Sequence, residues 1–356
     1  MSRTPLFSRR DALRAALAGG AALAGAPLWV PSTAHAVTYV RTGWQQVAVA
    51  ARTTGTSAYN QLLWVTMMRM DNKLAAPINR YYLWVWTHDV RLCRLFTAPQ
   101  PEGPWTQYLR SNGSPGVNLP PAMPYHSATH FSSGDVVWDP VEGALYSTPH
   151  TGPAGLPKQW TTIIRSTNGI DWEWVQPQPI VPNGPAGSFD DYQVCYGRIL
   201  RDYDSNVVRR DGKIVFYYRG ERSGQQYSVG AATGTSWDTW EKVSDTPLYK
   251  PINVSLHALG SALDIGDGKV HHILSCGVGS TPPFTQYHKE SDSADPFDWS
   301  DGPGLTLYSE PMATLADGPS YIIGHNGLHY MAYAQLQTDL LGGATSEVRV
   351  LRALAE

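Results

Sequence analysis

Residues 161–172 read TTIIRSTNGIDW, an apolar run with strand character followed by a polar turn and then Trp172. Three other stretches follow the same plan: LCRLFTAPQPEGPW (92–105), YSVGAATGTSWDTW (227–240) and FTQYHKESDSADPFDW (284–299). Together with Trp44, the tryptophans that end these stretches are spaced 61, 67, 68 and 59 residues apart. A period of this length indicates a repeated supersecondary unit.

The segments between the tryptophans have the pattern of short antiparallel strands. Runs such as YYLWVWTH, GKIVFYYRG and LHYMAYAQ are separated by Asp-Gly, Asn-Gly and Pro-Gly turn signals. Five marks at this period predict an all-β fold, a five-bladed β-propeller with four strands in each blade. We place the blades at 57–110, 128–180, 192–250, 257–307 and 317–354 with 37–50, and long inserts at 111–127 and 181–191. A pair of β-sandwiches is the alternative, which the period disfavours.

The two ends of the chain predict how the ring closes. The run from Ser346 to Leu354 has strand character but no following tryptophan, and the run from Val37 to Val49 contains Trp44 but no preceding strands. We therefore expect the N-terminal run to supply the outer strand of the last blade. Such closure removes two exposed sheet edges.

The first 36 residues have the pattern of an export signal. Ser8-Arg9-Arg10 is a twin-arginine motif, an apolar run from Ala15 to Val30 follows it, and Ala34-His35-Ala36 resembles a cleavage site. An uncleaved anchor is the alternative, but the apolar run is short for a bilayer span. We expect residues 1–36 to be a twin-arginine signal and residues 37–356 to be one propeller domain, periplasmic or extracellular.

Composition narrows the classes of partner. Without the four arginines and one aspartate of the signal, 27 basic and 30 acidic residues become 23 and 29, a net charge of about −6. This balance argues against nucleic acid or an anionic membrane surface. Trp (13) and Tyr (19) outnumber Phe (7), which suits a carbohydrate-facing surface. No metal-ligand spacing predicts a cofactor, and a structural ion on the axis stays open.

The three cysteines do not form a disulfide framework. Cys93, Cys195 and Cys276 are odd in number, widely spaced and set in apolar runs. We expect three buried thiols.

Polar residues recur where the first strand of each blade is expected to begin. Those starts face the axial pocket of a propeller, and they carry Asn60, Asp135, Asp190, Asp191, His257 and Asp317. The second strands add His88, His150, Arg219 and Glu221. Any one such aspartate could simply cap a turn, but convergence on one axis favours a site. Clustered carboxylates suit glycoside hydrolysis, which needs a proton donor and a second carboxylate.

Several segments resemble five-bladed glycoside hydrolases of the family 43, family 32 and family 117 kind. The segment Tyr81 to Trp105 is similar to their first blade, and His130 to Val136 is similar to their second-blade start. RSTNGIDWEW (165–174) resembles their Ser-x-Asp-Gly-x-x-Trp turn, and the run from Ala316 resembles their last-blade start. Such enzymes typically cleave furanosides, xylosides or anhydro-galactose linkages, usually without a catalytic metal.

The resemblance implies roles for individual residues. Asn60 stands where such enzymes usually place the base aspartate, and His257 stands where many place the acid glutamate. The family 117 kind implies His257 as proton donor and Asp191 as its orienting carboxylate, with Asp135 and Asp317 as base or sugar ligands. The implied catalytic set is Asp135, Asp191, His257 and Asp317. The expected sugar-binding set is Asn60, Trp86, His88, His130, His150, Tyr196, Arg198, Arg219 and Glu221.

Two other functions stay open at this stage. A polysaccharide lyase on a propeller needs a His or Tyr base and a cation at a uronate carboxylate, which His130, His150, Tyr196 and Arg198 could supply. A sugar-binding protein without catalysis is the other alternative, because Asn60 replaces the expected carboxylate.

Overall fold

The structure, a computed structural model, describes residues 43–55, 57, 60–87, 90–124, 126–153, 158–223, 227–278, 281–310, 315–338 and 344–354. The chain forms two units, Met1–His35 and Ala36–Glu356, and the described residues all belong to the second. The export signal and His88 lie outside the described residues, so both stay predictions. The described residues contain no α-helix, which confirms the all-β prediction, and none of their segments is a helix fit to cross a membrane.

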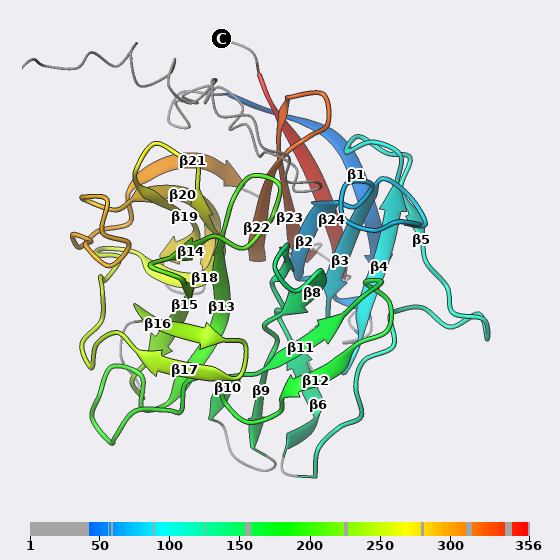
Figure 1. Cartoon of the computed structure of the whole chain (residues 1–356). Helices are drawn as coiled ribbons and strands as arrows, with labels where there is room; N and C mark the ends of the chain where they lie inside the picture. The colour runs from blue at the N-terminus through cyan, green and yellow to red at the C-terminus, as the bar shows by residue number, and fades with distance from the viewer. Residues whose placement is uncertain are drawn as a thin grey trace, which may run out of the picture. The chain divides into compact units, whose positions relative to one another are not determined.

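Twenty of the strands fall into runs of four, which we number sheets 1 to 5 in chain order (Figure 1). Sheets 3 and 4 are joined into one larger sheet, because their first strands pair in parallel at Leu200–Ala262 and Arg201–Leu263. Sheet 1 is β2 (Trp64–Arg69), β3 (Tyr81–Trp86), β4 (Cys93–Ala98) and β5 (Thr106–Gln107). Sheet 2 is β7 (Val136–Asp139), β8 (Ala144–Ser147), β11 (Ile163–Ser166) and β12 (Glu173–Gln176). Sheet 3 is β13 (Gln193–Arg201), β15 (Lys213–Glu221), β16 (Ser228–Ser236) and β17 (Thr239–Lys242).

The remaining two groups have longer strands. Sheet 4 is β18 (Ser255–Asp264), β19 (Val270–Val278), β20 (Thr281–Glu290) and β21 (Leu305–Glu310). Sheet 5 is β22 (Leu315–Ile323), β23 (His329–Thr338), β24 (Ala344–Ala353) and β1 (Trp44–Thr54). Within each group, strands pair antiparallel with their neighbours. Four further strands lie beside them, namely β6 (His126–Ser132), β9 (His150–Pro153), β10 (Gln159–Thr161) and β14 (Arg209–Arg210).

The first strand of the chain pairs with the last. β1 lies antiparallel to β24, with Trp44 opposite Ala353 and Thr54 opposite Thr345, and the register shifts twice along the pair. The N-terminal run thus occupies the outer position of sheet 5, next to the C-terminal strand (Figure 1).

The first strand of sheet 1 begins later than the sequence predicted. It starts at Trp64, whereas the predicted blade began at residue 57 and placed Asn60 at its pocket end. Asn60 instead belongs to the connection from β1, because its Nδ2 donates to the carbonyl oxygen of Thr54 at 2.8 Å. The hydroxyl of Thr53 also donates to the carbonyl oxygen of Asn60. Asn60 therefore holds a turn, and its assignment as a sugar ligand is not supported.

Hydrogen bonds from buried side chains connect the first strands of sheets 2, 3 and 4. Arg201 of β13 is fully buried, and its Nη1 lies 3.0 Å from Oδ1 of Asp135, just before β7. The Nη2 of Arg201 donates to the hydroxyl of Ser261 in β18 at 3.0 Å. Asp135 is 1% exposed. One guanidinium therefore ties three sheets together where no solvent competes for its bonds.

The same circuit continues through sheets 5 and 1. The hydroxyl of Ser261 donates to the carbonyl oxygen of Pro319 in β22 at 3.1 Å. The hydroxyl of Ser320 accepts the Met67 amide of β2 at 3.0 Å, and that of Thr66 accepts the Val136 amide of β7 at 3.2 Å. Each first strand is thus bonded to the first strand of the next sheet, and β22 is bonded back to β2.

Each repeated tryptophan closes the turn before the fourth strand of its sheet with a hydrogen bond from its indole ring. The indole Nε1 donates to a carbonyl oxygen three or four residues earlier: from Trp105 to Pro101, Trp172 to Gly169, Trp240 to Trp237 and Trp299 to Pro296, at 2.8–3.3 Å. Trp105 and Trp172 directly precede β5 and β12, Trp240 lies in β17, and Trp299 precedes β21. Each of these tryptophans thus lies between the third and fourth strands of its sheet or within the fourth.

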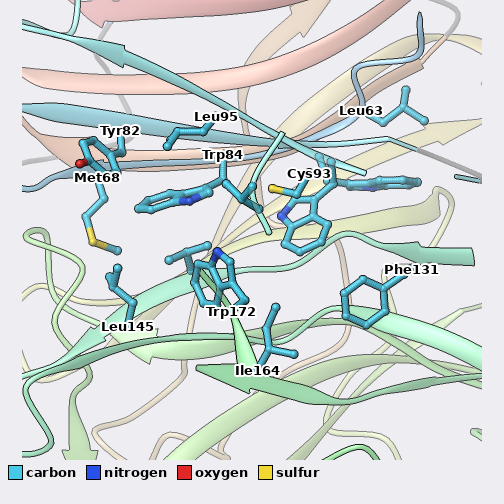
Figure 2. Close-up of a cluster of buried hydrophobic side chains, with 14 of the residues drawn as sticks. Leu63, Met68, Tyr82, Trp84, Cys93, Leu95, Phe131, Leu145, Ile164 and Trp172 are labelled. Carbon is cyan, nitrogen blue, oxygen red and sulfur yellow. The ribbon is translucent and has the colours of Figure 1, made fainter. Parts of the chain in front are cut away.

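Packing between sheets is less regular than the repeat. Trp172 meets Trp84 of sheet 1 edge-on, with ring centroids 6.4 Å apart, inside the apolar cluster of Figure 2. Between sheets 2 and 3, however, Trp237 stacks on Tyr146 at 3.8 Å. Trp240 packs within its own sheet, on Phe216.

Trp86 is part of this apolar core. It is 1% exposed, and its ring lies 5.9 Å from that of Phe131 between sheets 1 and 2. A side chain sealed in this way cannot stack on a sugar. Its assignment to the sugar-binding set is therefore corrected to a packing role.

We expect Asp135→Asn to lower the free energy of unfolding by about 3–5 kcal/mol, because it leaves the Arg201 guanidinium buried without its countercharge. Urea unfolding at neutral pH measures the change. Asp135→Leu combined with Arg201→Met should recover part of the loss, since it removes both charges. A loss below about 1 kcal/mol in Asp135→Asn would contradict the role given to this pair.

Asp139 makes a second connection between sheets 2 and 3, and it should make stability depend on pH. Burial opposes its charge, but hydrogen bonds from Arg209 (2.6 Å) and Trp237 (2.7 Å) bring its pKa below the usual value. Because the folded-state pKa is depressed, the stabilisation is complete above the unfolded-state pKa, about 4, and is lost as pH falls below it. We expect Asp139→Asn to cost about 2 kcal/mol at pH 7 and much less near pH 2.

Unfolding of Asp139→Asn and the parent chain by urea at both pH values measures this difference. Asp211→Asn, in the exposed turn before β15, is the matched control and should change little. An equal loss at both pH values would show that the carboxylate charge of Asp139 does not matter.

Candidate functional site

Rings from sheets 1 and 3 and from the strands β6 and β9 meet near the starts of β2 and β13. The ring of Tyr196 in β13 lies 4.8 Å from that of His150 in β9 and 5.6 Å from that of Trp64 in β2. His130 of β6 lies 4.8 Å from His150. We call Trp64, His130, His150 and Tyr196 the ring cluster. It brings three of the predicted sugar-binding residues together.

A break in β13 places Tyr196 in this cluster. The pairing of β13 with β15 shifts between Cys195 and Arg198, and Tyr196 has φ 53°. This left-handed conformation is strained for an aromatic residue, and such strain gathers at functional sites. A Cβ on the next residue, Gly197, would lie 2.1 Å from the Phe216 ring, so the break needs glycine there.

Arg219 of β15 holds Tyr196 from the other side. Its guanidinium lies 4.1 Å from the centre of the Tyr196 ring and 4.0 Å from that of Tyr227, and the residue is 4% exposed. Its Nη1 donates to the carbonyl oxygen of His257 at 2.6 Å, and its Nη2 donates to Oε1 of Gln193 at 2.7 Å. Arg219 therefore links the ring cluster to β18 of sheet 4.

Glu221 lies two residues after Arg219 on the same strand and hence on the same face. Burial raises the pKa of its carboxyl above the usual value, although the charge of Arg219 opposes that shift. A carboxyl that keeps its proton to higher pH can donate it to a leaving group. Glu221, which the sequence predicted as a sugar ligand, is thus a candidate proton donor.

The second sheet reaches into the site through an extension. Its first strand breaks at Ser133, which has φ 57°, and at Gly134, where a Cβ would lie 2.4 Å from Trp86. Beyond this break β6 and β9 turn toward sheet 3, and β10 pairs in parallel with β13 at Gln159–Gln193. This extension carries both histidines of the ring cluster.

Arg198 lies in the interior and not at a sugar-facing surface. It is 2% exposed and donates to the carbonyl oxygens of Ser133 (3.2 Å), Gly197 (2.9 Å) and Gly260 (2.6 Å). Each of these residues sits where a first strand loses its regular pairing, so its carbonyl has no ladder partner. The sugar-binding assignment of Arg198 is corrected to bracing the broken strands.

Three of the four predicted catalytic residues have described contacts. His257 contributes its carbonyl oxygen to Arg219, at a register shift of β18. Asp135 is engaged by Arg201, and Asp191 accepts the amides of Gly187 (2.6 Å) and Ser223 (3.4 Å) in a loop beside the site. Asp317 lies in β22, but its side chain is outside the described residues, as is the whole of His88.

Asp190, the first of the two predicted aspartates before β13, has a structural role. Asp190 is 1% exposed, binds Nζ of Lys242 at 2.7 Å and accepts the Tyr218 hydroxyl at 2.9 Å. These contacts lie within sheet 3 and hold the loop against its strands.

Three residues of the site were not predicted from the sequence. Gln193 accepts a hydrogen bond from Arg219, and the Arg219 guanidinium lies over the ring of Tyr227. Trp64 completes the ring cluster. Trp64 would have been found if the first blade had been started at the strand WVTMMR instead of at residue 57. Gln193 stands directly after a predicted blade start, but nothing in its sequence context distinguishes it.

No group of three or more His, Cys, Asp and Glu side chains could hold a metal ion in the part of the chain that the structure describes. The three cysteines are buried and free, as predicted. Burial raises the pKa of Cys195, next to the site, to about 11, so it is a thiol near neutral pH.

Comparisons with known proteins agree on the fold. No protein-family model and no curated sequence matches this chain. The structure of an endo-arabinase from Bacteroides thetaiotaomicron matches with a TM-score of 0.59 at 12% identity, covering 88% of this chain and 98% of that one. A thermostable family-43 glycoside hydrolase matches with a TM-score of 0.55 at 13% identity, covering 87% and 95%.

A third match carries a different printed activity. An N-acetylgalactosamine deacetylase from F. plautii, in complex with blood group B trisaccharide, has a TM-score of 0.57 at 14% identity and covers 88% and 96%. At these identities the likeness establishes the fold. The resemblance to propeller glycoside hydrolases is confirmed at that level.

We expect Arg219→Lys to lower the free energy of unfolding by about 2 kcal/mol, because an ammonium cannot make both forked bonds to His257 and Gln193. Urea unfolding measures the loss. Arg222→Lys is the control, because it makes the same Arg-to-Lys substitution at an exposed position three residues later. It should change the free energy of unfolding little. Equal stability of both variants would contradict the bracing role of Arg219.

Proposed function

We propose that this chain is an exported glycoside hydrolase that cleaves a polysaccharide or its oligosaccharides. In this proposal sheets 1 to 5 are the blades of a five-bladed propeller closed by β1, and the substrate enters an axial pocket at the ring cluster. The linkage is of the furanoside, xyloside or anhydro-galactose type. The twin-arginine motif of residues 8–10 supports export.

The convergence of the ring cluster with Arg219 and Glu221 carries this proposal. Sheets 1 and 3 and the strands β6 and β9 bring rings to one place, and aromatic faces are suited to sugar rings. Glu221 adds a carboxyl with a raised pKa beside them. The circuit of hydrogen bonds through β2, β7, β13, β18 and β22 supports a common axis. The fold shared with an endo-arabinase and a family-43 hydrolase supports the reaction class.

The reaction needs two groups with opposite tasks. We assign Glu221 as the proton donor to the glycosidic oxygen, because burial favours its neutral form. The partner carboxylate would activate water or attack the anomeric carbon. Asp317 and Asp191 are the candidates for this task, Asp317 by its place in the first strand of sheet 5 and Asp191 by its loop beside Glu221. His257, which lies in β18, would help to orient the proton donor Glu221.

A lyase is the second candidate, and one observation favours it. His130, His150 and Tyr196 lie ring to ring, and an imidazole or phenolate beside a buried arginine could abstract a proton next to a uronate carboxylate. The two reactions differ in their products, since elimination leaves an unsaturated sugar and hydrolysis does not. Ultraviolet absorbance and product mass after incubation with a panel of polysaccharides separate them.

On the substrate that the panel identifies, we expect Glu221→Gln to lower kcat by about 10²–10⁴-fold, the range for loss of a general acid. The same variant should keep most of its activity on an aryl glycoside of that sugar whose leaving group needs no proton. The parent's activity should fall as pH rises through the pKa of Glu221, and this limb should be absent in Glu221→Gln.

Glu241→Gln, an exposed carboxylate of β17, is the matched control and should leave kcat unchanged. Equal losses of Glu221→Gln on natural and activated substrates would remove Glu221 as the donor. Binding of glycans without any turnover of the panel would instead identify a sugar-binding protein.

A further inference from the structure

A cavity separate from the ring cluster opens beside it in sheet 3. Its volume is about 420 Å³, within the range of about 300–1,000 Å³ for small-ligand sites. Its wall includes Phe189, Arg222 and Lys250, with hydroxyls from Ser188, Ser228 and Thr246. It therefore combines cations, hydroxyl groups and one ring on a single wall.

The cavity adjoins the proposed proton donor along the chain. Arg222 directly follows Glu221 at the end of β15. Asp191 accepts the amide of Gly187, which lines the cavity, and that of Ser223, which follows the lining residue Arg222.

The rear wall of the cavity is rigid. The ring of Phe189 stacks on that of Tyr218, with centroids 6.1 Å apart. It lies over two glycines, since a Cβ on Gly220 or Gly230 would approach it to 2.5 or 2.8 Å. Tyr218 is in turn fixed by Asp190 at 2.9 Å. The shape of the cavity thus does not depend on an unconstrained side chain.

The charges on the wall favour an anion. Arg222 and Lys250 are both exposed, and in the described residues neither side chain has a hydrogen-bond or ion-pair partner. Asp245 supplies one negative charge on the same wall, so the local balance is one excess positive charge. The whole chain carries a net charge of −3, so this cationic wall contrasts with the rest of the protein.

We propose that this cavity is a subsite for an acidic sugar residue, whose carboxylate or sulfate is bound by Arg222 and Lys250. The inference rests on the proposed glycoside hydrolase and names its substrate class, an acidic polysaccharide. The anionic group makes charge-assisted hydrogen bonds to the two cations. The sugar ring lies against Phe189, and its hydroxyls bond to the serines and the threonine.

Calorimetry with the mature chain tests this subsite. The probes are an oligogalacturonate with its carboxyl-reduced counterpart, and a sulfated galactan oligosaccharide with its desulfated counterpart. We expect one charged member to bind at least tenfold tighter than its neutral match, and the pair that shows the difference identifies carboxylate or sulfate. The advantage should shrink as salt is raised, because the cations are exposed.

Variants locate the binding. Arg222→Gln with Lys250→Gln should weaken the charged glycan by on the order of tenfold and leave its neutral match unchanged. Asp245→Asn should tighten the charged glycan severalfold, because it removes the repelling charge. Lys213→Gln, at the exposed opposite end of β15, is the control for loss of one cation and should have no effect.

The outcomes separate this inference from the proposed function. Equal binding of charged and neutral glycans, full affinity in the double variant, or no binding of any probe overturns the subsite. Hydrolysis of neutral glycans that depends on Glu221 would then leave the proposed function standing. Charged glycans that bind through Arg222 and Lys250 but are never cleaved confirm the subsite and overturn the hydrolase.

Discussion

Two buried guanidinium groups of one strand hold the centre of this fold. Arg201 joins Asp135 to Ser261, and Arg198, three residues earlier, donates hydrogen bonds to three carbonyl oxygens at the breaks in the strands. Burial removes water as a competitor, so each bond is strong, and the loss of any partner is correspondingly costly. The first strands can therefore be irregular near the site, because their freed backbone groups have charged partners beneath them.

This irregularity is what makes the site. A regular β13 would alternate its side chains and keep Tyr196 in line with its neighbours. The break at Tyr196 and Gly197, the break at Ser133 and Gly134, and the extension β6–β9–β10 bring rings from sheets 1 and 3 and from β6 and β9 to one place. The structure thus stores strain at Tyr196 and offsets it through Arg219, which stacks on that ring and bonds to two neighbouring strands.

The sequence predicted the fold better than the site. Each repeated tryptophan stabilises a turn through a hydrogen bond to a residue three or four positions earlier. The sequence pattern of this turn is therefore local, and it recurs along the chain. The site depends on breaks in strand pairing and on which buried charges find each other, and neither leaves a periodic mark. Asp135 is predicted to face the pocket because it stands at a strand start, and Arg198 because a lyase needs a cation at a uronate carboxylate. Only the positions of Arg201 and of the freed carbonyls show that both are internal braces. Glu221, ranked among the sugar ligands, gains its role from burial beside Arg219.

The pairing of β1 with β24 has a consequence for how the chain is made. β1 is synthesised long before its partner β24, so it must wait, unpaired, until β24 has also been synthesised. Contacts between such distant segments form slowly, because the whole chain has to be brought into a loop. Sheet 5 is therefore the natural last step of folding, and a chain cut short at its C-terminal end leaves the exposed edge of β1 open to strands of other molecules.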